Sequence, residues 1–233
     1  AMRRAEAARA ERDAAQDAER ACAASIRALE EVERASAKAS GPALAWLSAH
    51  GDDFDAAVAP LSHEVSAPEG DEALVEHLLG SDVAALLVAD EHAARRIVSA
   101  IAEAGRDGEV SLVLRADDAC DGAPKAQGRP EGAIGEPLID RLTYPDAARR
   151  AVRALLGDVV VCDTLDEALT AHAADDAGLR FAVRDGAVVW PGGKITFGRG
   201  VSDAGQGALS RARELDELRA TLVSAKTATE GAC

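Results

Sequence analysis

The segment PLIDRLTYPDAARRAVRALLG (137–157) repeats, without a gap, the pattern of an earlier segment, PLSHEVSAPEGDEALVEHLLG (60–80). Seven positions are identical at an offset of 77 residues, among them two prolines, a Leu-Leu pair and the final glycine. Each segment leads into a short apolar strand that ends in Asp, and then into an Ala-rich helix at about 91–104 or 164–174. The repeat predicts two related subdomains of sheet and helix that face each other about a pseudo-twofold axis.

Turn and cap signals divide this central part further. In each repeat the first helix stops at Leu-Leu-Gly, and Asp90 and Asp163 are the predicted N-caps of the helices that follow. After the second repeat, strands are predicted at 180–184, 187–190 and 194–197, with turns at Asp185-Gly186 and Pro191-Gly192-Gly193. Residues 117–132, rich in Asp, Gly, Pro and Ala, are the predicted linker between the subdomains.

Two predicted helices flank the repeats. Residues 1–40 are rich in Ala, Glu and Arg and contain no Gly or Pro, and the C-terminal stretch mirrors them. Apolar residues in both follow the four–three spacing of a coiled-coil seam: Cys22, Ile26 and Leu29, and then Leu215, Leu218 and Leu222. One interpretation is an antiparallel pair of arms, and the other is that both helices fold back on the central part as surface helices. Composition alone does not decide between them.

The net charge of −15 is confined to the central part of this 233-residue chain. Residues 1–40 and 204–233 are each neutral overall, whereas residues 41–134 carry a net charge of −12 and residues 135–203 a net charge of −3. Taken whole, so acidic a chain is expected to repel nucleic acid and acidic membranes. No apolar run reaches the ~20 residues that a membrane span needs.

Motifs for catalysis or metal binding are weak. No phosphate-binding GxxxxGK[ST] loop and no HExxH motif occurs, and the four cysteines form no CxxC pair. We therefore expect no catalytic residue, no metal and no cofactor in this chain. His77 and His92 are expected on helix surfaces. The Gly-rich run 186–200 is a weak candidate for a phosphate cradle, because it leads into a strand and not into a helix N-terminus.

Two arms around a duplicated central part that ends in Gly-rich strands resemble the hinge domain of bacterial SMC (structural maintenance of chromosomes) proteins, the chromosome-organising ATPases of condensin type. The resemblance covers about 41–203, with the arms as coiled-coil stubs, and rests most on LLGDVVV (155–161) and LRFAVRDGAVVWPGGKIT (179–196). Gly186, Gly193 and Gly198 fit the glycine signature of the family. Position 197 departs from it, since Phe197 stands where the family has Gly.

The resemblance implies an α+β, SMC-hinge-like fold with two pseudo-symmetric subdomains of sheet and helix. Their expected bounds are 41–134 and 135–203, and the arms at 1–40 and 204–233 form an antiparallel coiled coil. The implied function is homodimerisation, in which subdomain 1 of each chain meets subdomain 2 of the other through sheet edges. The implied interface residues are Gly186, Gly193, Phe197, Gly198 and Gly200. The Phe197 ring would either fill a pocket across the interface or force the strands apart.

The resemblance also implies a role in chromosome condensation and segregation, a cytoplasmic location at the nucleoid, and weak, non-specific contact with DNA. Such contact would lie where the arms leave the globular part, at Arg34, Lys38, Lys194, Arg199, Arg211 and Arg213. The alternative account of these cations is that they pair with nearby acids. Two rival functions remain: a nucleic-acid-binding module with a basic face at Arg149, Arg150 and Arg153, and an enzyme that holds a phosphorylated ligand on the Gly-rich run.

Overall fold

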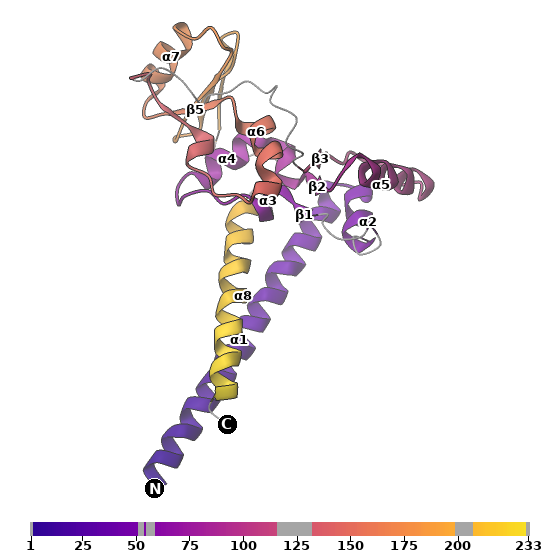
Figure 1. The fold of residues 1–233 in the computed structure, drawn as a ribbon, viewed down its shortest axis with the longest axis vertical. Helices are drawn as coiled ribbons and strands as arrows, with labels where there is room; N and C mark the ends of the chain where they lie inside the picture. The colour runs from indigo at the N-terminus through magenta and orange to yellow at the C-terminus, as the bar shows by residue number, and fades with distance from the viewer. Residues whose placement is uncertain (1, 51–53, 55–58, 116–131, 199–206, 232–233) are drawn as a thin grey trace. The chain divides into compact units, whose positions relative to one another are not determined.

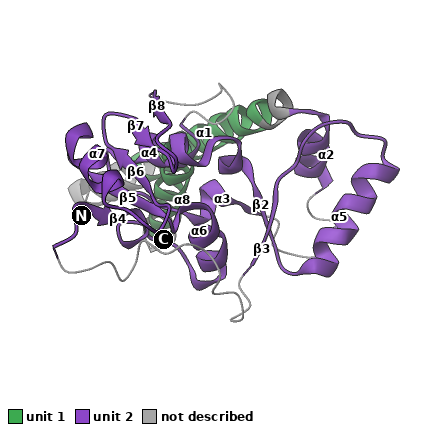
Figure 2. Ribbon diagram, turned by 90° about the horizontal axis from the view of Figure 1, so that it is seen from above, with its two compact units in different colours: residues 1–36, 210–233 green, residues 37–209 purple. Residues whose placement is uncertain are grey.

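The computed structural model describes residues 2–50, 54, 59–115, 132–198 and 207–231, and the chain divides into two compact units. Unit 1 contains residues 1–36 and 210–233, and unit 2 contains residues 37–209 (Figure 2). The predicted linker at 117–132 falls almost wholly outside the described residues. None of the described helices combines the length and the apolar character that a membrane span requires.

Unit 1 is formed by two long helices, α1 (Met2–Ser40) and most of α8 (Ala208–Gly231), which run antiparallel (Figure 1). Ile26 and Leu215 are buried, and Leu29, Leu218 and Leu222 are half-buried, as the four–three seam predicts. Arg219 of α8 lies 3.4 Å from Glu30 of α1, which ties the two helices together across the pair. Of the two interpretations that composition left open, the structure shows the antiparallel pair of arms.

Replacing Leu218 by Asp should unfold these arms locally, because it places a carboxylate on the half-buried seam. We expect a cost of about 2 kcal/mol and a loss of helical circular dichroism at low denaturant, while tryptophan fluorescence from unit 2 stays native. Val223→Asp is the matched control, since Val223 lies on the same helix but is 64% exposed. A single transition shared by both signals would show that the arms are part of one core with unit 2.

Unit 2 contains two sheets whose first three strands pair in the same way. In subdomain 1, β1 (Ala59–Pro60) pairs antiparallel with β2 (Leu86–Val88), which pairs parallel with β3 (Leu112–Leu114). In subdomain 2, β4 (Glu136–Pro137) and β5 (Val159–Cys162) pair antiparallel, and β5 pairs parallel with β6 (Arg180–Val183). Two hairpins then add β7 (Ala187–Val189) and β8 (Ile195–Phe197), so the described strands form a three-stranded and a five-stranded sheet.

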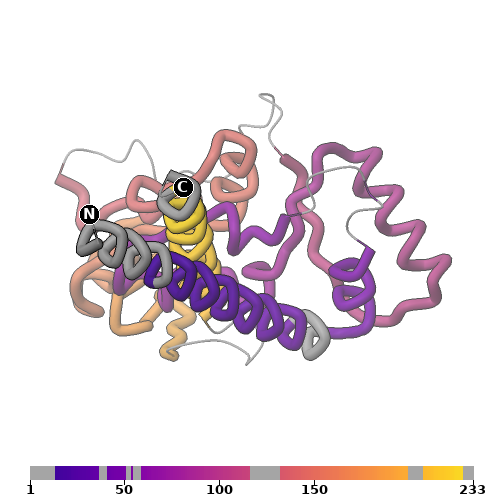
Figure 3. The backbone as a smooth tube through the Cα atoms, turned by 90° about the horizontal axis from the view of Figure 1, so that it is seen from below, coloured from indigo at the N-terminus to yellow at the C-terminus, as the bar shows by residue number. Residues whose placement is uncertain are grey.

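The helices of unit 2 repeat in the same way. Subdomain 1 has α3 (Leu61–Glu64), α4 (Glu72–Leu79) and α5 (Glu91–Glu103), and α2 (Pro42–His50) precedes them. Subdomain 2 has α6 (Arg149–Leu156) and α7 (Leu165–Ala173), with a 3₁₀ turn at Leu138–Asp140 in place of α3. Figure 3 follows the chain through both, with subdomain 1 in magenta and subdomain 2 in orange. The helices α4 and α6 lie 77 residues apart, as the repeat predicts.

A bridge between equivalent residues identifies the pseudo-twofold axis. Ser66 and Thr143 occupy the same position of the repeat, and each donates its backbone N–H to the carbonyl of the other at 2.9 Å. A reciprocal antiparallel bridge between matching residues places a local twofold axis between them. One apolar cluster spans this axis and joins α4, through Val75 and Leu79, to α6, through Val152 and Leu156.

The strands after the helices do not keep the 77-residue offset. Pro60 pairs with Leu86, whereas the equivalent Pro137 pairs with Val160, which lies only 74 positions after Leu86. Subdomain 1 uses the additional residues in a 3₁₀ turn at Gly80–Ala84.

This shift corrects one predicted cap. Asp90 caps α5 as expected, accepting a hydrogen bond of 2.7 Å from the backbone N–H of Ala93. In subdomain 2 the N-cap is Thr164 and not Asp163, and its hydroxyl accepts from the N–H of Glu167 at 3.2 Å. The prediction for Asp163 was wrong because the first helical turn begins one residue later in the sequence than the Asp alignment suggested.

Candidate functional site: an open sheet edge

The outermost strand of the five-stranded sheet, β8, presents an apolar edge. It pairs with β7 through Ala187–Phe197, Val188–Thr196 and Val189–Ile195, and its other edge has no partner among the described strands. Because side chains alternate along a strand, Ile195 and Phe197 share one face. Ile195 is 50% exposed and Phe197 is 74% exposed. An unpaired strand edge with two exposed apolar side chains favours association with another sheet edge.

The opposite face of β8 is held by Trp190. Its indole Nε1–H donates a hydrogen bond of 2.8 Å to the hydroxyl of Thr196. The guanidinium of Arg180 and the ammonium of Lys194 each lie 5.5 Å from the indole ring centroid, a cation–π distance. Thr196 is thus fixed from within the subdomain, and this leaves Ile195 and Phe197 as the contact face of the strand.

The described glycines of the predicted interface lie at the ends of the β7–β8 pair. Gly186 has a φ of 101°, and its carbonyl accepts a hydrogen bond of 3.2 Å from the N–H of Gly198, which closes one end of the β7–β8 pair. Gly193, with a φ of 84°, lies in the exposed turn at the other end. The structure therefore gathers Gly186, Phe197 and Gly198 at one end of the edge and places Gly193 at the other. Gly200 lies outside the described residues.

Sequence reasoning missed a residue of subdomain 1 that contacts this edge. A Cβ atom on Gly198 would lie 3.7 Å from Cε1 of His77 on α4. His77 is half-buried and both of its ring nitrogens are buried, so its expected place on a helix surface holds only in part. The apolar periodicity of α4 carries no sign of this contact, because Gly198 is 121 positions away in the sequence.

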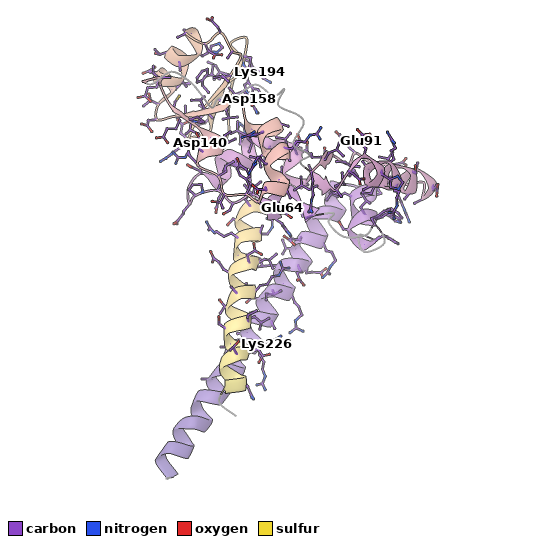
Figure 4. All side chains as sticks on the ribbon, in the orientation of Figure 1. Glu64, Glu91, Asp140, Asp158, Lys194 and Lys226 are labelled. Atoms are coloured by element: carbon purple, nitrogen blue, oxygen red, sulfur yellow. The ribbon has the colours of Figure 1, made fainter. Side chains whose placement is uncertain are left out.

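The six basic candidates are divided between the two units. Arg34 pairs with Glu31, and Arg213 lies 3.7 Å from Glu217, each on its own helix in unit 1. Lys194 is exposed in the β7–β8 turn of unit 2 (Figure 4), and Arg211 is half-buried on α8. The side chain of Lys38 and all of Arg199 lie outside the described residues.

The residues of the two rival functions are also accounted for. Arg149, the first residue of α6, pairs with Asp146 of the 3₁₀ turn that precedes the helix. The described part of the Gly-rich run, residues 186–198, forms two hairpin turns and two strands. It therefore lacks the helix N-terminus that usually holds a phosphate.

Comparison with known proteins agrees with this architecture. The model of the SMC proteins flexible hinge domain family matches residues 54–172. The chromosome partition protein Smc of Mycolicibacterium paratuberculosis is 33% identical over 167 residues, which are 72% of this chain and 13% of that protein.

Solved structures show the same fold. The asymmetric dimer of the Geobacillus stearothermophilus SMC hinge domain aligns with a TM-score of 0.70 at 24% identity, covering 97% of this chain and 91% of that one. The Pyrococcus furiosus Smc hinge domain with an extended coiled coil aligns at 0.51 and 19%, covering 97% and 87%. The family model matches more than half of this chain, and the duplicated fold is present. The chain therefore belongs to the flexible hinge domain family of SMC proteins.

Proposed function

We propose that this chain is the homodimerisation hinge of a chromosome-organising SMC ATPase, and that two copies pair through the open edge of β8. The observation that carries the proposal is the outer edge of β8, which has no partner among the described strands, with Ile195 and Phe197 exposed on one face. Burying two such side chains against a partner sheet supplies apolar contact area, and the unpaired backbone groups of β8 supply hydrogen bonds.

The distribution of charge supports a subdomain 1 to subdomain 2 arrangement across the dimer. Residues 41–134 carry a net charge of −12 and residues 135–203 a net charge of −3. Contacts between two subdomains of the first kind would bring together two strongly acidic surfaces, whereas mixed contacts reduce that repulsion. The edge of β3 in subdomain 1 is likewise unpaired on one side among the described strands, and it is a suitable partner for β8.

The wider role is part of the proposal. The chain spans about 13% of the length of the curated relative that it matches. The name of that relative refers to chromosome partition. We propose that the ATPase activity belongs to other parts of a longer protein. We further propose that this longer protein acts in chromosome condensation and segregation, and that it is located in the cytoplasm at the nucleoid. The described candidates Arg34 and Arg213 already have acidic partners, so the proposal rests on dimerisation and not on contact with DNA.

Replacing Phe197 by Ala should weaken the dimer by about 30-fold in Kd, because a large aromatic side chain at the edge is removed. Sedimentation velocity over a dilution series measures this directly. Val98→Ala is the matched control, since Val98 is 57% exposed on a helix, α5, and belongs to no strand, so it should leave the Kd unchanged. A parent chain that stays monomeric at every concentration, or a Phe197 variant with the parent's Kd, would refute this interface.

A further inference from the structure

Two adjacent residues of α4, Glu76 and His77, contact two segments far away in the sequence. The Glu76 carboxylate accepts hydrogen bonds at the start of α8, and Cε1 of His77 lies beside the end of β8, 3.7 Å from the position that a Cβ atom on Gly198 would take. All of these contacts lie within unit 2, whose last residues include Gly207 and Leu209. One turn of a subdomain 1 helix thus fixes both the place where the edge strand ends and the place where α8 begins.

The Glu76 carboxylate acts as a tertiary cap for α8. It is 4% exposed, and its two oxygens accept hydrogen bonds from the backbone N–H groups of Gly207, at 2.8 Å, and Leu209, at 2.9 Å. These are free N–H groups at the positive end of a helix, where a carboxylate is stabilised by the helix dipole. Leu209 belongs to the same apolar cluster as Leu78 of α4, so the first turn of α8 is held by packing as well as by charge.

The His77 contact is one of packing alone. Neither of its ring nitrogens has a hydrogen-bond partner among the described residues, although both are buried. Its Cε1 lies in van der Waals range of a Cβ built on Gly198, whose own N–H closes the β7–β8 ladder on Gly186. A larger side chain at position 198 would displace this ring, and such a displacement would move the helical turn that carries Glu76.

We propose that Glu76 and His77 couple the end of β8 to the first turn of α8, so that a displacement at either one loosens the other. The role of this coupling rests on the proposed function, which puts the end of β8 at the dimer edge. Since α8 continues from unit 2 into unit 1, the coupling links pairing at the edge to the anchoring of the C-terminal arm. Linkage requires the effect to be reciprocal.

The first test changes a residue at the end of β8 and measures amide hydrogen exchange in the first turn of α8. Gly198→Leu should displace His77 and raise the amide hydrogen exchange rate of Leu209 by about tenfold, as expected for loss of a charge-assisted hydrogen bond. Gly198→Ala is the matched control, because its Cβ makes only an ordinary contact at 3.7 Å.

A second set of variants tests whether the His77 ring carries the effect. In a His77→Ala background the leucine side chain at position 198 fits into the space left by the ring, so the exchange rate of Leu209 should no longer respond to Gly198→Leu. In a His77→Phe background the response should remain. An equal Leu209 rate in the parent and in Gly198→Leu would overturn the coupling, as would a response that persists without the His77 ring.

The test in the other direction needs no change near β8. Glu76→Gln keeps the side-chain shape but turns an amide donor toward one of the two N–H groups, so the cap is weakened. We expect exchange of the Gly198 amide to rise several-fold, while Glu69→Gln, at an exposed position before α4, leaves it unchanged. An unchanged Gly198 rate would overturn the coupling. Both readouts work in a monomer, so sedimentation of the parent chain tests the proposed function separately.

Discussion

Replacing Arg141 by Met should lower the free energy of unfolding of unit 2 by about 3–5 kcal/mol, because it leaves a buried carboxylate without its main partner. Asp71 of subdomain 1 is only 2% exposed. The Nε and Nη2 atoms of Arg141, in subdomain 2, lie 2.9 and 2.7 Å from its Oδ2 atom. The remaining partner, Arg184, is half in solvent and lies 3.3 Å from Oδ1, so it compensates for little of the loss.

Denaturant unfolding followed by tryptophan fluorescence measures this effect, since both tryptophans, Trp46 and Trp190, lie in unit 2. Arg95→Met is the matched control. Arg95 lies 3.2 Å from Glu91, but both side chains are more than two-thirds exposed, so its loss should cost less than about 1 kcal/mol. Equal destabilisation by the two variants would show that the Asp71–Arg141 pair does not hold the subdomains together.

Replacing Gly135 by Ala should destabilise unit 2 by about 2–5 kcal/mol, through backbone strain and a steric clash together. Gly135 has a φ of 82° and lies directly before β4. An added Cβ would lie 2.7 Å from Val160 Cγ1, 2.7 Å from the carbonyl oxygen of Val161 and 2.9 Å from the Cys162 sulfur. The carbonyl belongs to the paired strand β5, so it cannot move away without loss of sheet hydrogen bonds.

Gly178→Ala separates the two causes of this effect. Gly178 has a similar φ of 75°, but nothing lies within 4 Å of its Cβ position, so only the backbone term of about 1 kcal/mol applies. The difference between the two variants in the same fluorescence-monitored unfolding is the cost of the clash. If Gly135→Ala were no worse than Gly178→Ala, β4 would have to be free to move away from β5.

Patterns over a few residues predicted most of the architecture correctly. The continuous apolar run at 159–162 became the fully buried strand β5, and Asp185-Gly186 became the turn between β6 and β7. The stretch 1–40 without Gly or Pro became α1, which ends at Ser40, directly before Gly41. These predictions hold because each depends on interactions between residues close in sequence, whose preferences the side chains express directly.

The repeat gave one long-range prediction, since matching segments are expected to fold alike. The pseudo-twofold axis followed from it, and the Ser66–Thr143 bridge lies on that axis. The match of Asp163 with Asp90, made from their place after each strand, failed by one residue, because the paired strands place Thr164 at the position equivalent to Asp90.

Composition, seam spacing and the repeat therefore determine two flanking helices, two related subdomains and a last strand at 194–197. The folded chain alone decides that Asp71 meets Arg141, that Glu76 caps a helix 131 positions later, and that His77 supports Gly198. The reason is physical: a charged or polar side chain is compatible with a solvated helix face and equally with a buried pair. Only the packing of distant segments removes water from it and selects its partner.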